Sequence, residues 1–320
     1  MPFMQIRELA DRIRSNVGRV IVGKEDVVDQ LLIALISSGH VLLEDVPGTG
    51  KTLLAKAMAR SLGCGFKRIQ FTPDLLPSDL SGIHYYNQKL SEFEFRPGPL
   101  FTNILLADEI NRATPRTQSS LLECMEERQI SIDGHTHRLS RPFLVIATQN
   151  PIESQGTFPL PEAQLDRFLF KIKMGYPTAE EGLHILKRFK EANPLESIES
   201  VADASDITLA QDTYAQVSVS DDVLVYLLHI VERTRVHADV AVGVSPRGSQ
   251  ALLKAAQVHA IIRGRDFVTP DDVKAMAEPV MAHRMLLKAA LRSRQAEAVR
   301  TIIDKILLDV PVPAEAKSFA

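Results

Sequence analysis

The sequence predicts an α/β protein: a parallel five-stranded sheet between helices, followed by a smaller domain built from helices alone. Three observations support this prediction. Apolar strands and helical segments alternate up to about Tyr176, which is typical of a parallel sheet covered on both faces. Later segments have only helical periodicity and helix-start signals. The 320 residues suffice for two domains. We therefore divide the chain into residues 1–176 and 177–320.

The first domain is predicted to begin with two helices and to continue with five strands. The opening helix covers about residues 6–17, and the second runs from Glu25 to Ser37 after the short apolar turn Val20–Gly23. A helix from Thr52 to Leu62 follows the first strand. The candidate strands, each rich in apolar residues, are residues 40–43, 66–71, 102–107, 143–148 and 168–174. Near-continuous apolar runs are expected for strands that are buried on both faces.

Two predicted hairpins interrupt this alternation. The first pairs residues 83–86 with residues 92–96 around a polar turn at 87–89. The second covers Gln129 to Arg138 and turns at Asp133-Gly134, a dipeptide typical of tight hairpin turns. His135 and His137 lie in this hairpin, but no cysteine or acidic residue stands at metal-ligand spacing. We interpret it as a solvent-exposed hairpin face rather than a metal site.

Helix-start signals define the second domain. Thr178 and Glu181 form a predicted capping box for a helix that runs to Lys190. Serine and threonine accept hydrogen bonds from the free N–H groups of a first turn, and proline suits the first helical position. Three further helices are therefore predicted to begin near Ser220, Ser245 and Thr269, and a last helix covers about residues 295–308.

The stretch from Leu42 to Thr52 is the strongest indication of function. It joins an apolar strand, a glycine-containing turn and a Lys-Thr pair that opens a helix. In such a turn the backbone N–H groups surround the phosphates of a nucleoside triphosphate, the lysine reaches the β and γ oxygens, and the threonine hydroxyl binds Mg²⁺. The usual pattern has glycine where this chain has Asp45, so chance glycines are the alternative for this stretch alone. The candidate phosphate-binding residues are Pro47, Gly48, Thr49, Gly50, Lys51 and Thr52.

Two acidic residues close the predicted strand at 102–107. At such a strand end Asp108 would hold Mg²⁺ through its water shell, as in the P-loop NTPases. Its neighbour Glu109 would orient and deprotonate the attacking water as a general base. The alternative is a helix-start pair without a metal. The phosphate-binding turn earlier in the chain favours the nucleotide interpretation.

Three polar residues complete the candidate site. Asn150 follows the strand at 143–148, where an amide can hydrogen-bond the γ-phosphate and the attacking water, although Asn-Pro also begins ordinary turns. Arg167 can neutralise charge on the transferred phosphoryl group or simply pair with a surface acid. Arg247 stands in the first turn of a helix, where a cation opposes the helix dipole, which indicates an anionic partner.

Composition excludes several other classes of protein. The formal net charge is −3, so no bulk positive field favours nucleic acid. Cys64 and Cys124 lack metal-ligand spacing, and a chain of this size needs no disulfide scaffold, which indicates a reducing compartment. The N-terminus lacks the apolar core of a signal peptide, and no apolar run could span a bilayer. We expect a cytoplasmic location.

With these motifs in hand, the chain resembles the AAA+ ATPases and, within them, the MoxR family. The matching segments are residues 44–52, 107–112, 147–151, 159–168 and 245–248. The resemblance spans nearly the whole chain, and the segment at 159–168 is specific to this family rather than to P-loops in general. Asp45 is ordinary within MoxR-type P-loops.

The resemblance implies a role for each matching residue. Lys51 and Thr52 become the Walker A ligands, and Asp108 and Glu109 become the Walker B acids. Asn150 corresponds to sensor 1, Arg167 to the arginine finger and Arg247 to the sensor 2 arginine. The pair Val22 and Gly23 stands where such proteins contact adenine. The hairpin at 83–96 resembles the helix-2 insert, and that at 129–138 the pre-sensor hairpin.

The family also implies ATP and Mg²⁺ as ligands and a ring, usually of six subunits, with nucleotide at each subunit interface. Its members are similar to the ATPase subunit of magnesium chelatase and are thought to mature or activate other proteins, often partners with a von Willebrand A domain.

Two alternative functions remain at this stage. A nucleic-acid motor is disfavoured by the net charge, so no stable nucleic-acid binding and no membrane insertion are expected. A nucleotide-binding switch with little turnover would not need Glu109, Asn150 and Arg167 together.

Overall fold

The structure is a computed structural model, and it describes residues 2–44, 46, 48–151, 156–191, 193–289 and 295–313. The chain forms two compact units, each described here by itself. The larger, called the sheet unit, contains Leu9–Phe168 and Ile172–Gln211. The smaller, called the second unit, contains Met1–Glu8, Leu169–Lys171 and Asp212–Ala320.

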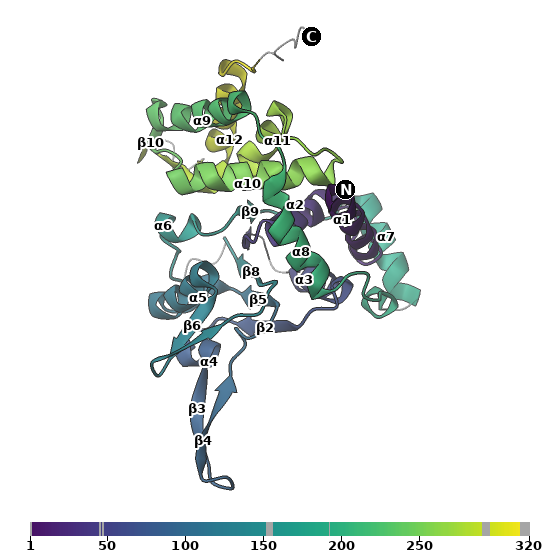
Figure 1. Ribbon diagram of the computed structural model, residues 1–320, viewed down its shortest axis with the longest axis vertical. Helices are drawn as coiled ribbons and strands as arrows, with labels where there is room; N and C mark the ends of the chain where they lie inside the picture. Colours follow the sequence, from purple (N-terminus) through teal and green to yellow (C-terminus); the bar gives the residue numbers. More distant parts are fainter. Residues whose placement is uncertain are drawn as a thin grey trace. The chain divides into compact units, whose positions relative to one another are not determined.

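The predicted five-stranded parallel sheet is confirmed. Its strand order is β2-β5-β8-β1-β9, so neighbours in space are distant in sequence (Figure 1). The pairings of β2 with β5, β5 with β8 and β8 with β1 are all parallel, as crossover helices require. The strands are β1 (Val41–Glu44), β2 (Phe66–Gln70), β5 (Ile104–Asp108), β8 (Leu144–Gln149) and β9 (Phe170–Ile172).

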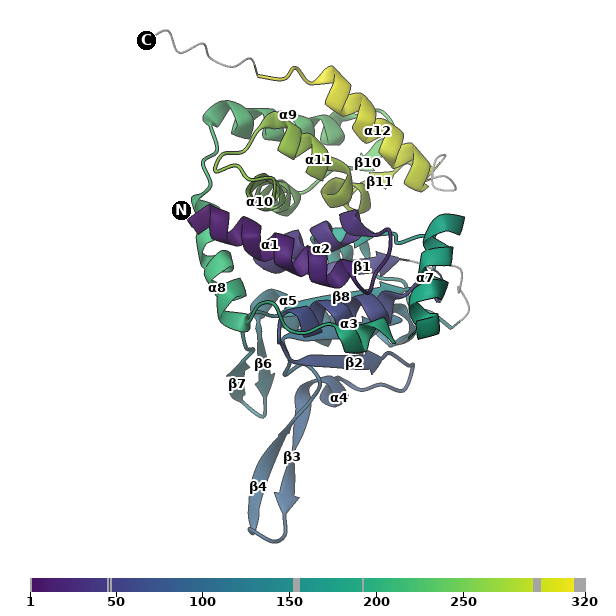
Figure 2. The same ribbon diagram turned by 90° about the vertical axis from the view of Figure 1, so that its right-hand side faces the viewer.

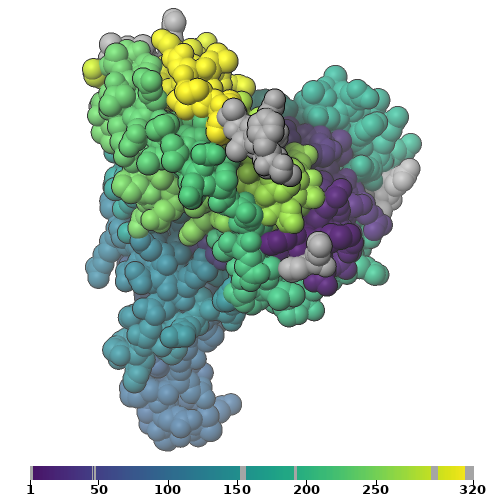
Figure 3. All heavy atoms as spheres, turned by 45° about the horizontal axis from the view of Figure 1, so that its top comes forward, coloured from purple at the N-terminus to yellow at the C-terminus, as the bar shows by residue number. Residues whose placement is uncertain are grey.

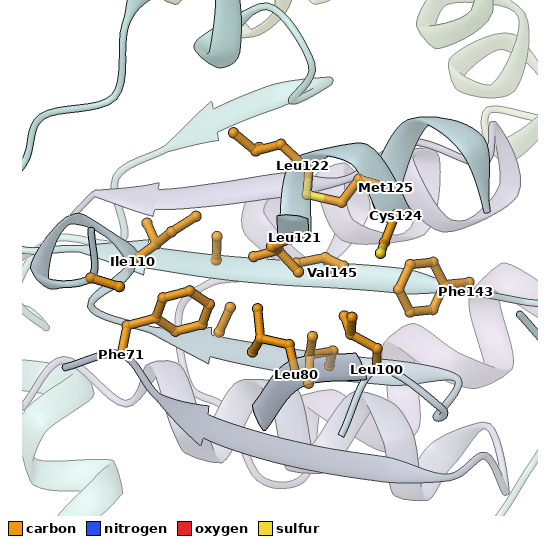
Figure 4. Close-up of a cluster of buried hydrophobic side chains, with 14 of the residues drawn as sticks. Phe71, Leu80, Leu100, Ile110, Leu121, Leu122, Cys124, Met125, Phe143 and Val145 are labelled. Atoms are coloured by element: carbon orange, nitrogen blue, oxygen red, sulfur yellow. The ribbon is translucent and has the colours of Figure 1, made fainter. Parts of the chain in front are cut away.

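Helices cover both faces of this sheet because its central strands are apolar on both sides. On one face, Leu121, Leu122 and Met125 of α5 (Pro115–Glu127) pack in a buried cluster with Val145 of β8 (Figure 4). Residues of the alternate register, such as Leu106 of β5, point to the other side, where α3 (Lys51–Ser61) lies (Figure 2). The α3 segment agrees with the predicted helix at residues 52–62, whereas α5 was not predicted.

Among the described residues, six further helical segments and the 3-10 turns η1 (Ile110–Arg112) and η2 belong wholly or mainly to the sheet unit. Thr178 and Glu181 form the predicted capping box at the start of α7, with Thr178 N donating to Glu181 Oε2 at 2.8 Å and Glu181 N donating to Thr178 Oγ1 at 3.2 Å. The sheet unit includes α7 and most of α8, so this compact unit extends beyond residue 176. The division into a nucleotide-binding domain and a lid domain at residue 176 stays a prediction. These segments are α1 (Pro2–Gly18), α2 (Glu25–Ile36), α4 (Pro77–Ser81), α6 (Glu162–Leu165), α7 (Ala179–Glu191), η2 (Pro194–Ser197) and α8 (Ala204–Thr213).

Both predicted hairpins are present. The first consists of β3 (Gly82–Asn87) and β4 (Glu92–Pro97), and the second of β6 (Gln129–Ile132) and β7 (His135–Arg138). The β3–β4 hairpin projects from the sheet unit (Figure 3). It carries exposed apolar side chains, among them Phe93. The second hairpin is not simply a solvated face: His137 stacks on Phe95 of β4 with ring centroids 4.8 Å apart.

The second unit has the predicted helices, whose starts are capped as expected. Ser220 accepts a hydrogen bond from Val223 N, and Ser245 accepts one from Gly248 N. A short antiparallel pair of strands adds to the purely helical architecture that the sequence predicted. The elements are η3 (Tyr214–Gln216), α9 (Asp221–Val236), β10 (Val240–Val242), α10 (Pro246–Ile262), α11 (Pro270–Met281), η4 (Ala282–Arg284), β11 (Leu286–Leu287) and α12 (Gln295–Asp309).

A buried carboxylate joins α10 to α11. The side chain of Asp272 is fully buried, and its oxygens accept hydrogen bonds from Arg265 at 2.5 and 2.7 Å and from Thr269 Oγ1 at 2.9 Å. His259 Nδ1 of α10 lies 2.7 Å from Asp272 Oδ1. Although burial alone would raise it, these donors hold the pKa of Asp272 well below its usual range.

Two further features concern the cysteines and the lengths of the helices. Cys64 and Cys124 are free thiols. Across the part of the chain that the structure describes, every helix is too short or too polar to cross a membrane.

Candidate functional site

The register of the sheet brings the predicted Asp108 and three polar residues that were not predicted to one edge. Gln70 of β2 is paired with Asp108 of β5, and Glu44 of β1 is paired with Gln149 of β8. All four stand at the carboxyl ends of their strands. The carboxyl ends of parallel strands share an edge, and ligands of such sheets bind there. The strand order therefore brings these residues together at the edge where a ligand is expected. Gln149 Nε2 donates to Glu44 Oε1 at 2.6 Å, which joins β8 to the start of the phosphate-binding turn.

The phosphate-binding turn runs from β1 into the first turn of α3. Gly48 and Gly50 have φ values of 87° and 89°, a left-handed conformation that glycine adopts without strain. A Cβ atom at either glycine would meet no atom within 4 Å, so it is the left-handed backbone and not lack of space that favours glycine at these positions. Lys51 Nζ donates to Val46 O at 3.1 Å, and Thr49 Oγ1 donates to the same carbonyl at 3.3 Å. Pro47 and Asp45 lie outside the described residues.

A single threonine ties the two acidic residues together. Thr148 Oγ1, on β8, donates to Asp108 Oδ1 at 2.6 Å and accepts from Glu109 N at 2.9 Å. Glu109 has a φ of 55°, which is uncommon for a residue with a side chain, so the hydrogen bond to its N–H helps to hold this turn. The turn directs the chain from β5 into η1 (Ile110–Arg112).

Three cationic or amide groups hold the acidic side chains. Arg68 of β2 donates to Asp108 Oδ2 at 2.6 Å. Gln70 Nε2 donates to Glu109 Oε2 at 2.6 Å, and Arg112 Nε lies 2.8 Å from the same oxygen. None of these three contacts was predicted from the sequence. Arg68 and Gln70 are two residues apart on β2, so their side chains lie on the same face of the strand. This spacing indicates a role in the site only once β2 is known to lie beside β5.

The donor set suits a magnesium ion that arrives with a nucleotide. Mg²⁺ in such sites keeps several waters and takes few protein ligands, with phosphate oxygens supplying the rest. Among the residues that the structure describes, no group of three or more His, Cys, Asp or Glu side chains could hold a metal by itself. Thr52, in the first turn of α3, and Asp108 have the oxygen chemistry required, and each carboxylate oxygen of Asp108 can accept a further water.

The other predicted residues of the sheet unit occupy distinct positions around this edge. Asn150 is buried directly after β8, the strand between β5 and β1. Arg167 follows α6, and its Nε lies 3.2 Å from Glu126 Oε2 at the end of α5. The surface acid foreseen as its partner is therefore present. Val22 and Gly23 form a turn before α2, in which Gly23 has a φ of 67° and a Cβ atom would collide with the Glu181 carboxylate.

Arg247 belongs to the second unit. It lies exposed in the first turn of α10, directly after the Ser245 cap and Pro246. Arg247 therefore lies at the N-terminus of a helix, as predicted. Its role toward a nucleotide stays a prediction.

Comparisons with known proteins agree with this arrangement. Residues 40–170 match the family described as "ATPase family associated with various cellular activities (AAA)", and residues 232–306 match the AAA lid domain. The chain is 50% identical to the protein YeaC of Bacillus subtilis, with 97% of each chain covered. It is 43% identical to chaperone MoxR1 of Mycobacterium tuberculosis over 95% of this chain and 82% of that protein. A crystal structure of a candidate ATPase from Cytophaga hutchinsonii is similar, with a TM-score of 0.91, 38% identity and coverage of 98% of this chain and 97% of that one.

Proposed function

The chain belongs to the MoxR family of AAA+ ATPases, and from this premise we propose that it hydrolyses Mg²⁺-bound ATP in a ring assembly and thereby remodels or matures a protein partner. The observation that carries the proposal is the Thr148 hydroxyl, which joins Asp108 to Glu109 at the sheet edge where the phosphate-binding turn begins. A water-activating acid is thereby tied to the carboxylate that suits the metal.

Binding is assigned to the turn and its helix. The N–H groups of Gly48, Thr49 and Gly50 would surround the phosphates, and Lys51 would leave Val46 O to reach the β and γ oxygens. Pro47 belongs to the same loop by sequence, while Val22 and Gly23 are assigned to adenine. Thr52 and Asp108 would hold Mg²⁺, which when bound neutralises charge on the phosphates.

Hydrolysis is assigned to Glu109 and three polar partners. A water oxygen attacks the γ-phosphorus, its proton passes to the Glu109 carboxylate, and the bond to the ADP oxygen breaks. Asn150 would orient the water. Arg167 of an adjoining subunit and Arg247 would neutralise the negative charge that develops, since an arginine supplied in this way can increase the rate by about 10³–10⁵.

We further propose a ring of six identical subunits and a protein client that carries a von Willebrand A domain. The name of the Mycobacterium tuberculosis relative, a chaperone, supports a protein client rather than a nucleic acid. The net charge of −3 agrees with the same choice.

Two substitutions test the ATPase proposal. Glu109→Gln keeps the shape of the side chain but removes the base, so ATP binding should persist while turnover falls by about 10² or more. Lys51→Ala removes the phosphate contact and should abolish binding. The measurements are fluorescent-nucleotide titration and phosphate release with and without Mg²⁺. Turnover by the Glu109→Gln variant at the parental rate would show that Glu109 is not the base.

The same variant tests the client proposal. A Glu109→Gln ring stalled with ATP should retain its client from a lysate of the source cells, whereas Lys51→Ala should not. Mass spectrometry of the retained proteins should show one with a von Willebrand A domain. Retention of nucleic acid, with ATP turnover that DNA stimulates and salt suppresses steeply, would support the motor alternative instead.

A further inference from the structure

Helix α5 contacts both parts of the proposed catalytic apparatus of the sheet unit. Near its start it meets the turn that follows Glu109, and near its end it meets Arg167. No role in the reaction has been assigned above to any residue of this helix. Its side-chain hydrogen bonds and ion pairs with the two regions, among the described residues, involve Gln118, Ser119 and Glu126.

Gln118 makes the contacts near the start of α5. Its side chain is fully buried, and its Nε2 lies 3.2 Å from Ile110 O, 3.1 Å from Ala113 O and 2.8 Å from Phe158 O. A side-chain amide has only two hydrogens, so the three carbonyls share them. A buried donor that serves three backbone carbonyls fixes the segments that carry them, because each carbonyl would otherwise lose its hydrogen bond away from water.

The two segments that Gln118 joins also contact each other. Phe158 N donates to Asn111 O at 2.6 Å, so Phe158 is held through its N–H by η1 and through its carbonyl by Gln118. The η1 turn is in turn attached to Glu109, because Arg112 N donates to Glu109 O at 2.9 Å and the Arg112 side chain pairs with its carboxylate. The backbone at residue 158 is therefore linked to the turn of the proposed base.

Residue 158 begins the segment that leads to Arg167. Further along this segment, Gln164 Nε2 of α6 lies 3.5 Å from Ser119 Oγ of α5, and Arg167 pairs with Glu126. The segment is also anchored by apolar residues, since Leu160 and Phe168 belong to the buried cluster that α5 forms with the sheet. Figure 4 shows Leu121, Leu122 and Met125 of α5 within that cluster.

We propose that Gln118 is a positioning residue that keeps the turn of Glu109 and the segment bearing Arg167 in one fixed mutual arrangement. This inference rests on the proposed function, because it assigns the base to Glu109 and the trans-acting arginine to Arg167. Within one subunit these two groups serve different nucleotides: Glu109 acts on the subunit's own ATP, and Arg167 acts on that of a neighbour. Gln118 therefore couples two adjoining active sites through α5.

The test compares two buried glutamines. Gln118→Met keeps the volume and removes the amide, and Gln211→Met makes the same change at a glutamine that is also buried and donates to Leu35 O at 2.7 Å. Nucleotide affinity, KM, kcat and unfolding temperature are measured for both full-length variants. We expect Gln118→Met to lower kcat by about tenfold to hundredfold with KM within about twofold of the parent, because it displaces catalytic groups without touching the nucleotide. Gln211→Met should keep the parental kcat even if it unfolds earlier.

An unchanged kcat for Gln118→Met, or an equal loss for Gln211→Met, would overturn the inference. If Gln118→Met does not fold, the exposed end of the same link provides a second test. Glu126→Lys repels Arg167 and should lower kcat by about tenfold or more, whereas Glu127→Lys, one residue away, should not. An unchanged kcat for Glu126→Lys would also overturn the inference.

Failure of the proposed function gives a different result. Parental turnover by both Glu109→Gln and Arg167→Ala would reject the proposed function itself. Loss of turnover in those two variants, with parental turnover in the Gln118 and Glu126 variants, would reject only the link through α5.

Discussion

Thr148 shows how much one hydroxyl group can organise. It donates to the proposed metal-site carboxylate and accepts from the backbone N–H of the proposed base, so its position fixes both. A hydroxyl can do this because it has one hydrogen and two lone pairs. Threonine also suits β8, since its branched side chain favours strands. The same residue therefore stabilises the strand and sets the geometry of the site.

Replacing this hydroxyl should impair turnover more than binding. Thr148→Val keeps the branched shape and removes both hydrogen bonds, and we expect kcat to fall by about 10- to 100-fold, as for other residues that orient metal ligands. Thr148→Ser keeps the hydroxyl and should stay within about threefold of the parental rate. Steady-state phosphate release measures both. A parental rate in the valine variant would show that Asp108 and Glu109 hold their positions without Thr148.

A second buried residue, His40, acts on stability rather than chemistry. Its Nδ1 accepts from Val145 N at 3.0 Å, and its Nε2 lies 3.0 Å from Met125 O. Since Val145 N can only donate, the ring is neutral with its hydrogen on Nε2. Burial lowers the pKa of His40 to about 3.

This lowered pKa predicts a loss of stability in acid. Between about pH 6.5 and pH 3 the unfolded chain binds a proton that the folded chain excludes, so the free energy of unfolding falls as the pH falls. Between pH 7.5 and pH 5 the contribution of His40 should be about 2 kcal/mol. Urea unfolding of the parent and of His40→Gln at both pH values measures it. The variant should lose about that much less on acidification; an equal loss would refute the assignment.

At the scale of elements, the strands and most helices could be predicted because their signals are local. Apolar runs marked the strands of the sheet, and the Thr178 and Ser245 caps marked helix starts that the structure confirms. Helix α5 was missed although Thr114-Pro115 is a helix-start signal. Its buried face carries the polar Gln118, which interrupts the apolar periodicity.

From the sequence alone, only those site residues could be predicted that come directly after a strand or lie in a loop with its own sequence pattern. Asp108, Glu109 and Asn150 are recognisable in this way, and the Lys51 turn has its own pattern. Arg68 and Gln70 could not be assigned, since their contacts depend on β2 lying beside β5. The pairing of strands distant in sequence is not encoded in either strand alone.

The Asp272 network gives a prediction about the helices α10 and α11. Asp272→Ala would leave Arg265 and His259 without their buried carboxylate, and we expect the free energy of unfolding to fall by about 3 kcal/mol. Asp271→Ala is the control, because that side chain is exposed and its pair with Lys274 spans 3.7 Å, so its loss should cost less than about 1 kcal/mol. Chemical denaturation measures both; equal losses would refute the role given to burial.

At the scale of the whole molecule, the proposed ring makes each active site a joint property of two subunits. In the proposed ring, a heterologous interface would place the Arg167 of one subunit beside the nucleotide of the next. The Arg167 side chain is 30% exposed in its pair with Glu126, so it remains accessible from outside its own subunit.

Mixed rings should therefore recover activity from inactive parents. Lys51→Ala subunits lack the nucleotide but keep Arg167, and Arg167→Ala subunits keep the nucleotide. Equal mixing should restore up to about a quarter of the parental ATP turnover, because one in four interfaces combines an intact Lys51 with an intact Arg167. Phosphate release after subunit exchange measures this. Absence of recovery, when native mass spectrometry shows that mixed rings have formed, would contradict an arginine acting in trans.

The turn at Gly23 has a consequence for how sequences of this kind can vary. Any side chain at this position would displace the Glu181 carboxylate, which also accepts a hydrogen bond from the N–H of Thr178, the capping residue before α7. The loop assigned to the adenine base is thus packed against the start of a helix some 160 residues later, and no space is left between them for a Cβ atom at residue 23. A substitution at residue 23 would move the Glu181 side chain and so weaken the hydrogen bond that caps α7.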